Sequence, residues 1–154
     1  MSDPVEPVSR RGFLAGATAL GAPAPAVPAV ARQHGIVVLI DRNDPHVMGH
    51  AISYAANLSR HFAGKGQAVP PIEVVANGLG IDVFRADKSP LKEPLAVLRQ
   101  MVPTIAFSMC ASSKSIAESK ENVTIQLIDG ARLVPFGVGR MVELQMKGWA
   151  YIHG

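Results

Sequence analysis

The chain has little of three things that often reveal a function: cysteine, aromatic residues and an excess of charge. Cys110 is its single cysteine, so an internal disulfide is excluded, and the thiol is free, linked to another chain, or carrying a bound group. Aromatic residues make up 5% of the 154 residues, and the formal net charge is only +3. Without an aromatic stacking platform or a basic stripe, nucleic acid is not an expected partner. No segment after residue 31 is long enough to predict a membrane span.

The beginning of the chain has the features of a twin-arginine export signal. Arg10 and Arg11 form the arginine pair, and residues 15–22 follow as an apolar stretch that is too short to span a bilayer as a helix. Prolines after this stretch would break a helix. We therefore expect export to the periplasm by the twin-arginine pathway. The alternative is a disordered tail rich in alanine and proline.

Small residues mark two places where such a signal would be removed. The pattern predicts cleavage after Ala31, and Ala26 marks a second possible site. Residues 1–31 are then the signal peptide with its cleavage region. Residues 32–154 form a single domain that is long enough to bury a core.

The rest of the chain alternates between strand and helix patterns. Continuous aliphatic and β-branched runs predict buried strands, and we take the first of them as the central strand. Apolar residues at helical spacing predict the helices, in one of which Leu95, Leu98 and Met101 should face the core. The expected strands are residues 35–40, 72–76, 104–109, 131–135 and 149–152; the expected helices are residues 45 to about 64, 91–101, a short segment capped by Ser112 or Ser113, and a segment around 141–147.

Five strands interleaved with helices predict a three-layer α/β/α sandwich around a five-stranded, mainly parallel sheet. In such sheets ligands collect at the carboxyl ends of the strands. Asp41, Asn77, Gly78 and Cys110 each follow a predicted strand, so we expect all four at this edge.

Cys110 is the first candidate for a reactive residue. Its position between a strand and a helix would place it near helix N-terminal amides, which stabilise a thiolate and lower its pKa from an ordinary value of about 8.5. Lys114 is a candidate cation one turn away, and its alternative is an ordinary solvated lysine. The alternative for Cys110 itself is a small apolar side chain packed in the core.

A stripe of histidines on the first predicted helix is the other candidate site. His46 and His50 are four residues apart, a spacing that can bring two imidazoles to one metal ion. No third ligand is obvious, and His61 and His153 add candidates without a geometry. A solvated or interface surface is the alternative, and we expect neither a metal nor another cofactor.

Three stretches of the chain together resemble the DsrE/DsrF-like family of sulfur-relay proteins: residues 73–78, the strand-to-cysteine segment 105–110, and residues 134–152. They occur in the family's order and spacing, and the resemblance covers most of residues 35–154. It implies a five-stranded α/β/α fold, homo-oligomers that are often trimers or hexamers, and a cysteine after the third strand that carries a persulfide. Cys110 occupies that place.

The resemblance implies a sulfur carrier or sulfurtransferase. In this hypothesis Cys110 accepts a persulfide from a donor and passes it to an acceptor, each being a protein or a small sulfane-sulfur compound. The alternative hypothesis is a non-catalytic oligomeric domain for binding or scaffolding, in which Cys110 is only packed.

Overall fold

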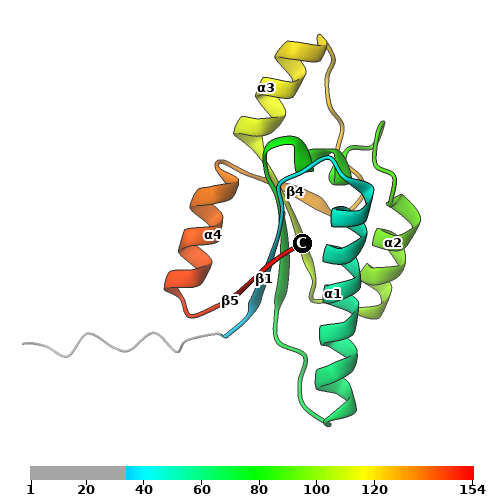
Figure 1. Cartoon of the computed structure of the whole chain (residues 1–154), viewed down its shortest axis with the longest axis vertical. Coiled ribbons are helices and arrows are strands. Elements are labelled where there is room, and N and C mark those ends of the chain that lie inside the picture. The colour runs from blue at the N-terminus through cyan, green and yellow to red at the C-terminus, as the bar shows by residue number, and fades with distance from the viewer. Residues whose placement is uncertain (1–33) are drawn as a thin grey trace, which may run out of the picture. The chain divides into compact units, whose positions relative to one another are not determined.

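The computed structural model describes residues 34–154, which form one sheet enclosed by helices (Figure 1). The predicted export signal and its cleavage sites lie outside these residues. No helix in this range combines the length and the apolar character needed to cross a membrane. The elements in chain order are β1 (Ile36–Ile40), α1 (Pro45–Gly64), β2 (Ile72–Ala76), the 3-10 helix η1 (Gly78–Phe84), α2 (Lys92–Met101), β3 (Ala106–Cys110), α3 (Ala111–Glu121), β4 (Ala131–Val134), α4 (Gly137–Met146) and β5 (Ala150–His153).

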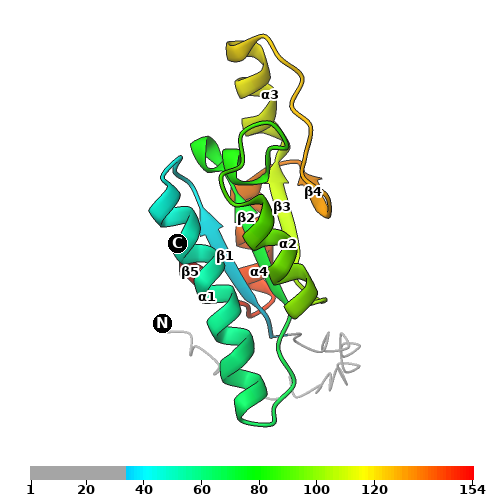
Figure 2. The same ribbon diagram turned by 90° about the vertical axis from the view of Figure 1, so that its right-hand side faces the viewer.

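The five strands are parallel and lie in the order β4-β3-β2-β1-β5. Helices α1 and α2 cover one face of the sheet and α4 covers the other, while α3 projects beyond the carboxyl ends of the strands (Figures 1 and 2). The predicted three-layer α/β/α sandwich is therefore confirmed. The prediction that the first strand is central is wrong, because β2 takes the middle position. The interior strands β1, β2 and β3 are all largely buried on both faces, so burial in the sequence pattern does not show which of them is central.

The two faces of the sheet carry cores of unequal size. Successive side chains of a strand point to opposite faces, so Val38 joins the large core under α1 and α2 while Val37 points toward α4. On the α4 side, the buried apolar residues are Val37, Val75, Met141 and Leu144. Helix α4 is consequently held by only a small apolar contact.

Helices α1 and α2 can be compared with the predicted helix ends and inward-facing residues. Helix α1 begins as predicted, with the Asp44 carboxylate accepting the amide of His46 at 2.8 Å and proline in the first turn. In α2, Leu98 is buried as predicted, but Met101 is 45% exposed. Met101 is the last residue of the helix, and the core position at this end is filled by Val102, which is 2% exposed.

A buried arginine connects η1 to α3. The Arg85 side chain is 0% exposed and donates to Glu121 at 2.8 and 2.9 Å, to Asp87 at 3.0 and 2.7 Å, and to Asp82 at 3.2 Å. Hydrogen bonds from Arg85 and Lys88 lower the pKa of Glu121 to about 2. Helix α3 contains no buried residue, so this ion cluster replaces an apolar face in attaching its outer end.

We predict that Arg85→Met will lower the free energy of unfolding by about 3 kcal/mol, because it leaves carboxylates without their buried counter-ion. Arg60→Met is the matched control, since Arg60 is exposed and contacts Asn57 on its own helix. The control should change the free energy by no more than about 0.5 kcal/mol. Denaturant unfolding measures both, and equal effects would contradict the structural role of Arg85.

Candidate functional site

Cys110 is both the last residue of β3 and the N-cap of α3, so no loop separates the strand from the helix. Its sulfur accepts the amide N–H of Ser113 at 3.4 Å. The sequence predicts Ser112 or Ser113 as the cap, and this prediction is wrong. The cysteine sulfur takes the place usually filled by a side-chain oxygen, and both serines lie inside the first turn.

The beginning of α4 approaches the same sulfur. Gly137, the first residue of α4, is buried so closely that a β-carbon there would lie 3.1 Å from Cys110 Cβ and 3.2 Å from Asn77 Cβ. The Ser112 amide donates to the carbonyl of Pro135 at 3.3 Å, which fixes the β4–α4 connection against α3. The N-terminal turns of two helices therefore meet at one thiol.

These donors favour a charged sulfur. Burial raises the pKa of the Cys110 thiol, but the nearby Ser113 hydroxyl and the backbone amides of Gly137, Ser113 and Ser112 outweigh it, so the pKa is below its ordinary value. The positive ends of two helix dipoles act in the same direction. The Cys110 residue is only 3% exposed. The thiol is thus directed at backbone donors rather than at solvent.

Asn77 and Gly78 complete the surroundings of the thiol through Ser113. The hydroxyl oxygen of Ser113 accepts the Gly78 amide at 2.9 Å and donates to the side-chain oxygen of Asn77 at 3.1 Å. Gly78 has φ +55°, a conformation that glycine adopts without strain and that turns its N–H toward α3. Three of the four residues predicted at the carboxyl edge, Asn77, Gly78 and Cys110, are thereby brought together.

Two other predicted residues have different partners. The carboxylate of Asp41 lies at the same edge of the sheet, but its Oδ2 is 3.4 Å from Nε2 of His153. The ammonium of Lys114 donates to Glu118 at 2.6 Å, one turn further along α3. The groups that lower the pKa of Cys110 are a hydroxyl and backbone amides, and Lys114 is not among them.

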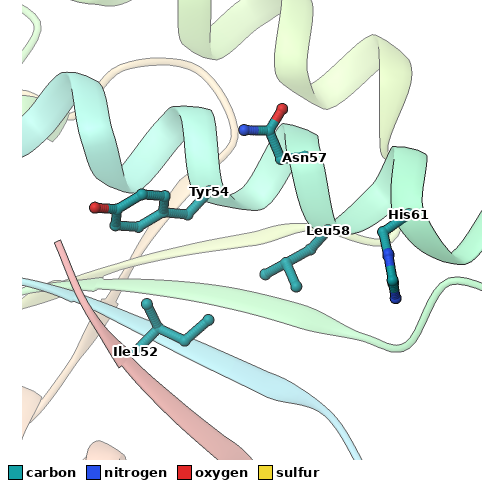
Figure 3. Close-up of a pocket in the computed structure, with 5 residues that line it drawn as sticks. All are labelled: Tyr54, Asn57, Leu58, His61 and Ile152. Atoms are coloured by element: carbon teal, nitrogen blue, oxygen red, sulfur yellow. The ribbon is translucent and has the colours of Figure 1, made fainter.

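The histidine surface of α1 faces outward. His46, His50 and His61 are all exposed, and His50 stacks on Tyr54 with ring centroids 6.0 Å apart. Across residues 34–154, no group of three or more His, Cys, Asp or Glu side chains is placed to hold a metal ion. His61 borders an open groove of about 490 Å³, whose lining residues are Tyr54, Asn57, Leu58, His61 and Ile152. Figure 3 shows these side chains, four of them on α1 and Ile152 on β5.

Sequence reasoning missed a charged cluster on the α4 face of the sheet. Glu73, the second residue of the buried strand β2, is 2% exposed. Its carboxylate accepts Arg140 Nε at 2.9 Å, Arg140 Nη2 at 2.7 Å and the Ser108 hydroxyl at 2.7 Å, and Arg132 Nη2 lies 3.2 Å away. Burial raises the pKa of Glu73, but these partners lower it on balance. The available signal was a lone glutamate inside an otherwise apolar strand, which requires a cationic partner.

We predict opposite outcomes for two neighbouring glycines of α4. Gly137→Ala should lower the free energy of unfolding by about 1–3 kcal/mol, because its new β-carbon would press on Cys110 and Asn77. Gly139→Ala should be neutral or stabilising by up to about 1 kcal/mol. Its β-carbon would meet Phe136 Cβ at an ordinary 3.5 Å, and alanine favours the helix. Denaturant unfolding compares the two, and equal losses would contradict the tight contact at Gly137.

Comparisons with known proteins bear on the fold. No family model matches the chain, and no curated protein matches it either. Among solved structures, the protein MTH1491 of Methanobacterium thermoautotrophicum, described as of unknown function, is similar over 79% of this chain and 99% of its own, with 27% identity and a TM-score of 0.64. This similarity supports the α/β/α architecture.

Proposed function

We propose that this chain is an exported DsrE-like sulfur carrier or sulfurtransferase whose Cys110 holds a persulfide. One observation carries the proposal: the N-terminal turns of α3 and α4 converge on the Cys110 sulfur. Backbone amides at helix N-termini bind anions. The two anionic forms of this residue, the thiolate and the persulfide, are the species that a sulfur carrier must hold.

The transfer is a pair of nucleophilic displacements. The Cys110 thiolate attacks the outer sulfur of a donor persulfide, the donor S–S bond breaks, and the donor leaves as a thiolate with the electron pair. An acceptor thiolate then attacks the outer sulfur of the Cys110 persulfide and releases the Cys110 thiolate. One sulfur atom moves from donor to acceptor, and no external oxidant or reductant is consumed.

A cavity reaches Ser113, the neighbour of the thiol, although Cys110 itself does not line it. It has a volume of about 410 Å³ and lies between η1 and α3, with Gly78, Leu79, Ser113, Ile116 and Lys120 among its lining residues. Ser113 borders this cavity and also donates its amide to the Cys110 sulfur. We assign the cavity to the donor or acceptor group that reaches the sulfur.

Export by the twin-arginine pathway to the periplasm is part of the proposal. It rests on the arginine pair Arg10 and Arg11 and on the apolar stretch that follows. A thiol outside the cytoplasm is open to oxidation. Because Cys110 is only 3% exposed, its own fold shields it, which is compatible with this location.

The same burial favours a second candidate, a non-catalytic binding or scaffold domain in which Cys110 is merely packed. The two candidates differ in the reactivity of the folded protein. A carrier thiol reacts with alkylating reagents without unfolding, whereas a packed thiol reacts only after denaturation.

We predict that the full chain incubated with polysulfide will gain the mass of one sulfur atom on Cys110, while Cys110→Ser gains none. Intact-mass spectrometry measures this gain, and subsequent addition of a small thiol should remove it, since the acceptor step reverses the loading. Equal mass changes in the two proteins, or no change in either, would contradict the carrier function and favour the packed cysteine.

We also propose a homo-oligomer, as the family resemblance implies, with a trimer or a hexamer as the expected state. The supporting observation is an exposed apolar row on α4, consisting of Val138, Val142 and Met146 at successive helical turns. An exposed apolar row of this kind is typical of a surface that another chain covers.

We predict that Val142→Asp will shift the protein to a smaller assembly, because it places a carboxylate in the α4 row. Val97→Asp on α2 is the matched control, since the two valines are 49% and 52% exposed. Size-exclusion chromatography with light scattering measures the mass of each. A wild-type monomer, or the same dissociation in both variants, would contradict assembly through α4.

A further inference from the structure

The beginning of α4 lacks the usual means of fixing a helix end. Its N-cap residue, Phe136, makes no side-chain capping hydrogen bond, and α4 adds only Met141 and Leu144 to the apolar core beneath it. The first turn of α4 nevertheless packs closely against Cys110, because a β-carbon at Gly137 would lie 3.1 Å from the Cys110 β-carbon. The Ser112–Pro135 hydrogen bond of 3.3 Å fixes the connection before α4, but a further interaction has to hold the helix itself.

The Glu73–Arg140 ion pair meets that need. Arg140 is one turn after Gly137 on α4, and its guanidinium makes two hydrogen bonds of 2.9 and 2.7 Å to the two oxygens of Glu73. Glu73 is fixed in turn by Ser108 of β3 and is almost completely buried. A bidentate pair to a carboxylate that is immobile in the sheet fixes both the distance and the direction of the arginine.

We propose that the Glu73–Arg140 pair is a positioning device, which holds the first turn of α4 against Cys110 and so keeps the Gly137 backbone beside the Cys110 side chain. Neither residue reacts with substrate. Both act through α4, as groups behind a reacting atom do when they hold its neighbours in place. The inference rests on the proposed function, in which Cys110 is the reacting thiol.

A purely electrostatic effect of Glu73 on the Cys110 pKa would have the opposite sign to a positioning effect, so the two can be distinguished by experiment. The charged groups around the pair are Glu73, Arg132, Arg140 and Glu143, which lies 3.5 Å from Arg140, while Lys114 and Glu118 of α3 pair with each other. Removing the negative charge of Glu73 would favour the thiolate if only charge mattered. Removing the positioning of α4 would disfavour it, because an amide donor is lost.

The test is the pH dependence of Cys110 alkylation by iodoacetamide in the wild type, Glu73→Gln and Arg140→Lys. Arg140→Lys keeps the charge but cannot form the bidentate pair. Both variants should raise the apparent pKa of the thiol, and the alkylation rate at pH 7 should fall about threefold to tenfold, the effect expected for losing one helix-terminal donor. Arg99→Lys alters an exposed ion pair to Asp129 and should leave the profile unchanged.

A lower pKa in Glu73→Gln together with an unchanged profile in Arg140→Lys would overturn the positioning role. If Glu73→Gln fails to fold, the pH profile of Arg140→Lys alone tests the positioning role, because this substitution preserves the charge and most of the volume of the side chain. The Gly137 amide resonance in NMR spectra should also shift in Arg140→Lys, and an unmoved resonance would contradict the proposal. Alkylation does not require sulfur transfer, so failure of persulfide loading in the wild type would be recognised separately.

Discussion

The direct passage of β3 into α3 is the constraint on which the rest of the site depends. Because Cys110 ends the strand and caps the helix, its sulfur has no loop in which to move and must accept the amides of the first helical turn. The parallel arrangement then brings the carboxyl ends of β2 and β4 beside it. From β2 come Asn77 and Gly78, and after β4 comes the first turn of α4. The surroundings of the thiol thus follow from strand direction and from one shared residue.

Buried ion pairs attach two helices of this protein to the rest of the fold, a role that apolar contacts have in most proteins. Helix α3 has no buried residue, and Arg85 attaches its outer end to η1 through Glu121. Helix α4 adds little to the core, and Arg140 attaches it to the sheet through Glu73. Each pair is hydrogen-bonded in bidentate geometry, which gives direction as well as attachment. The two helices whose N-termini face Cys110 are therefore held by directional interactions rather than by a broad apolar surface.

The sequence was sufficient for the fold and for the place of the thiol, since β-branched runs, helical spacing and the Asp44 cap are local signals. It was insufficient wherever the outcome depends on partners that are distant in the chain. Glu73 and Arg140 are 67 residues apart, so no local pattern could pair them. Lys114 is close to Cys110 in sequence and was therefore a candidate cation for the thiol. In the structure its ammonium pairs instead with Glu118, one turn further along α3. The order of the interior strands could not be predicted either, because each is buried on both faces and its sequence does not specify its neighbours.

The central claim is that two helix N-termini stabilise a negative charge on Cys110. The most direct measurement is the pH titration of the wild-type thiolate by its ultraviolet absorbance, with Cys110→Ser as the blank. The account predicts a midpoint below about 8.5, the ordinary value for a cysteine thiol, because the amide and hydroxyl donors outweigh burial. A midpoint at or above that value would contradict the account, since burial would then dominate and Cys110 would be a packed core residue.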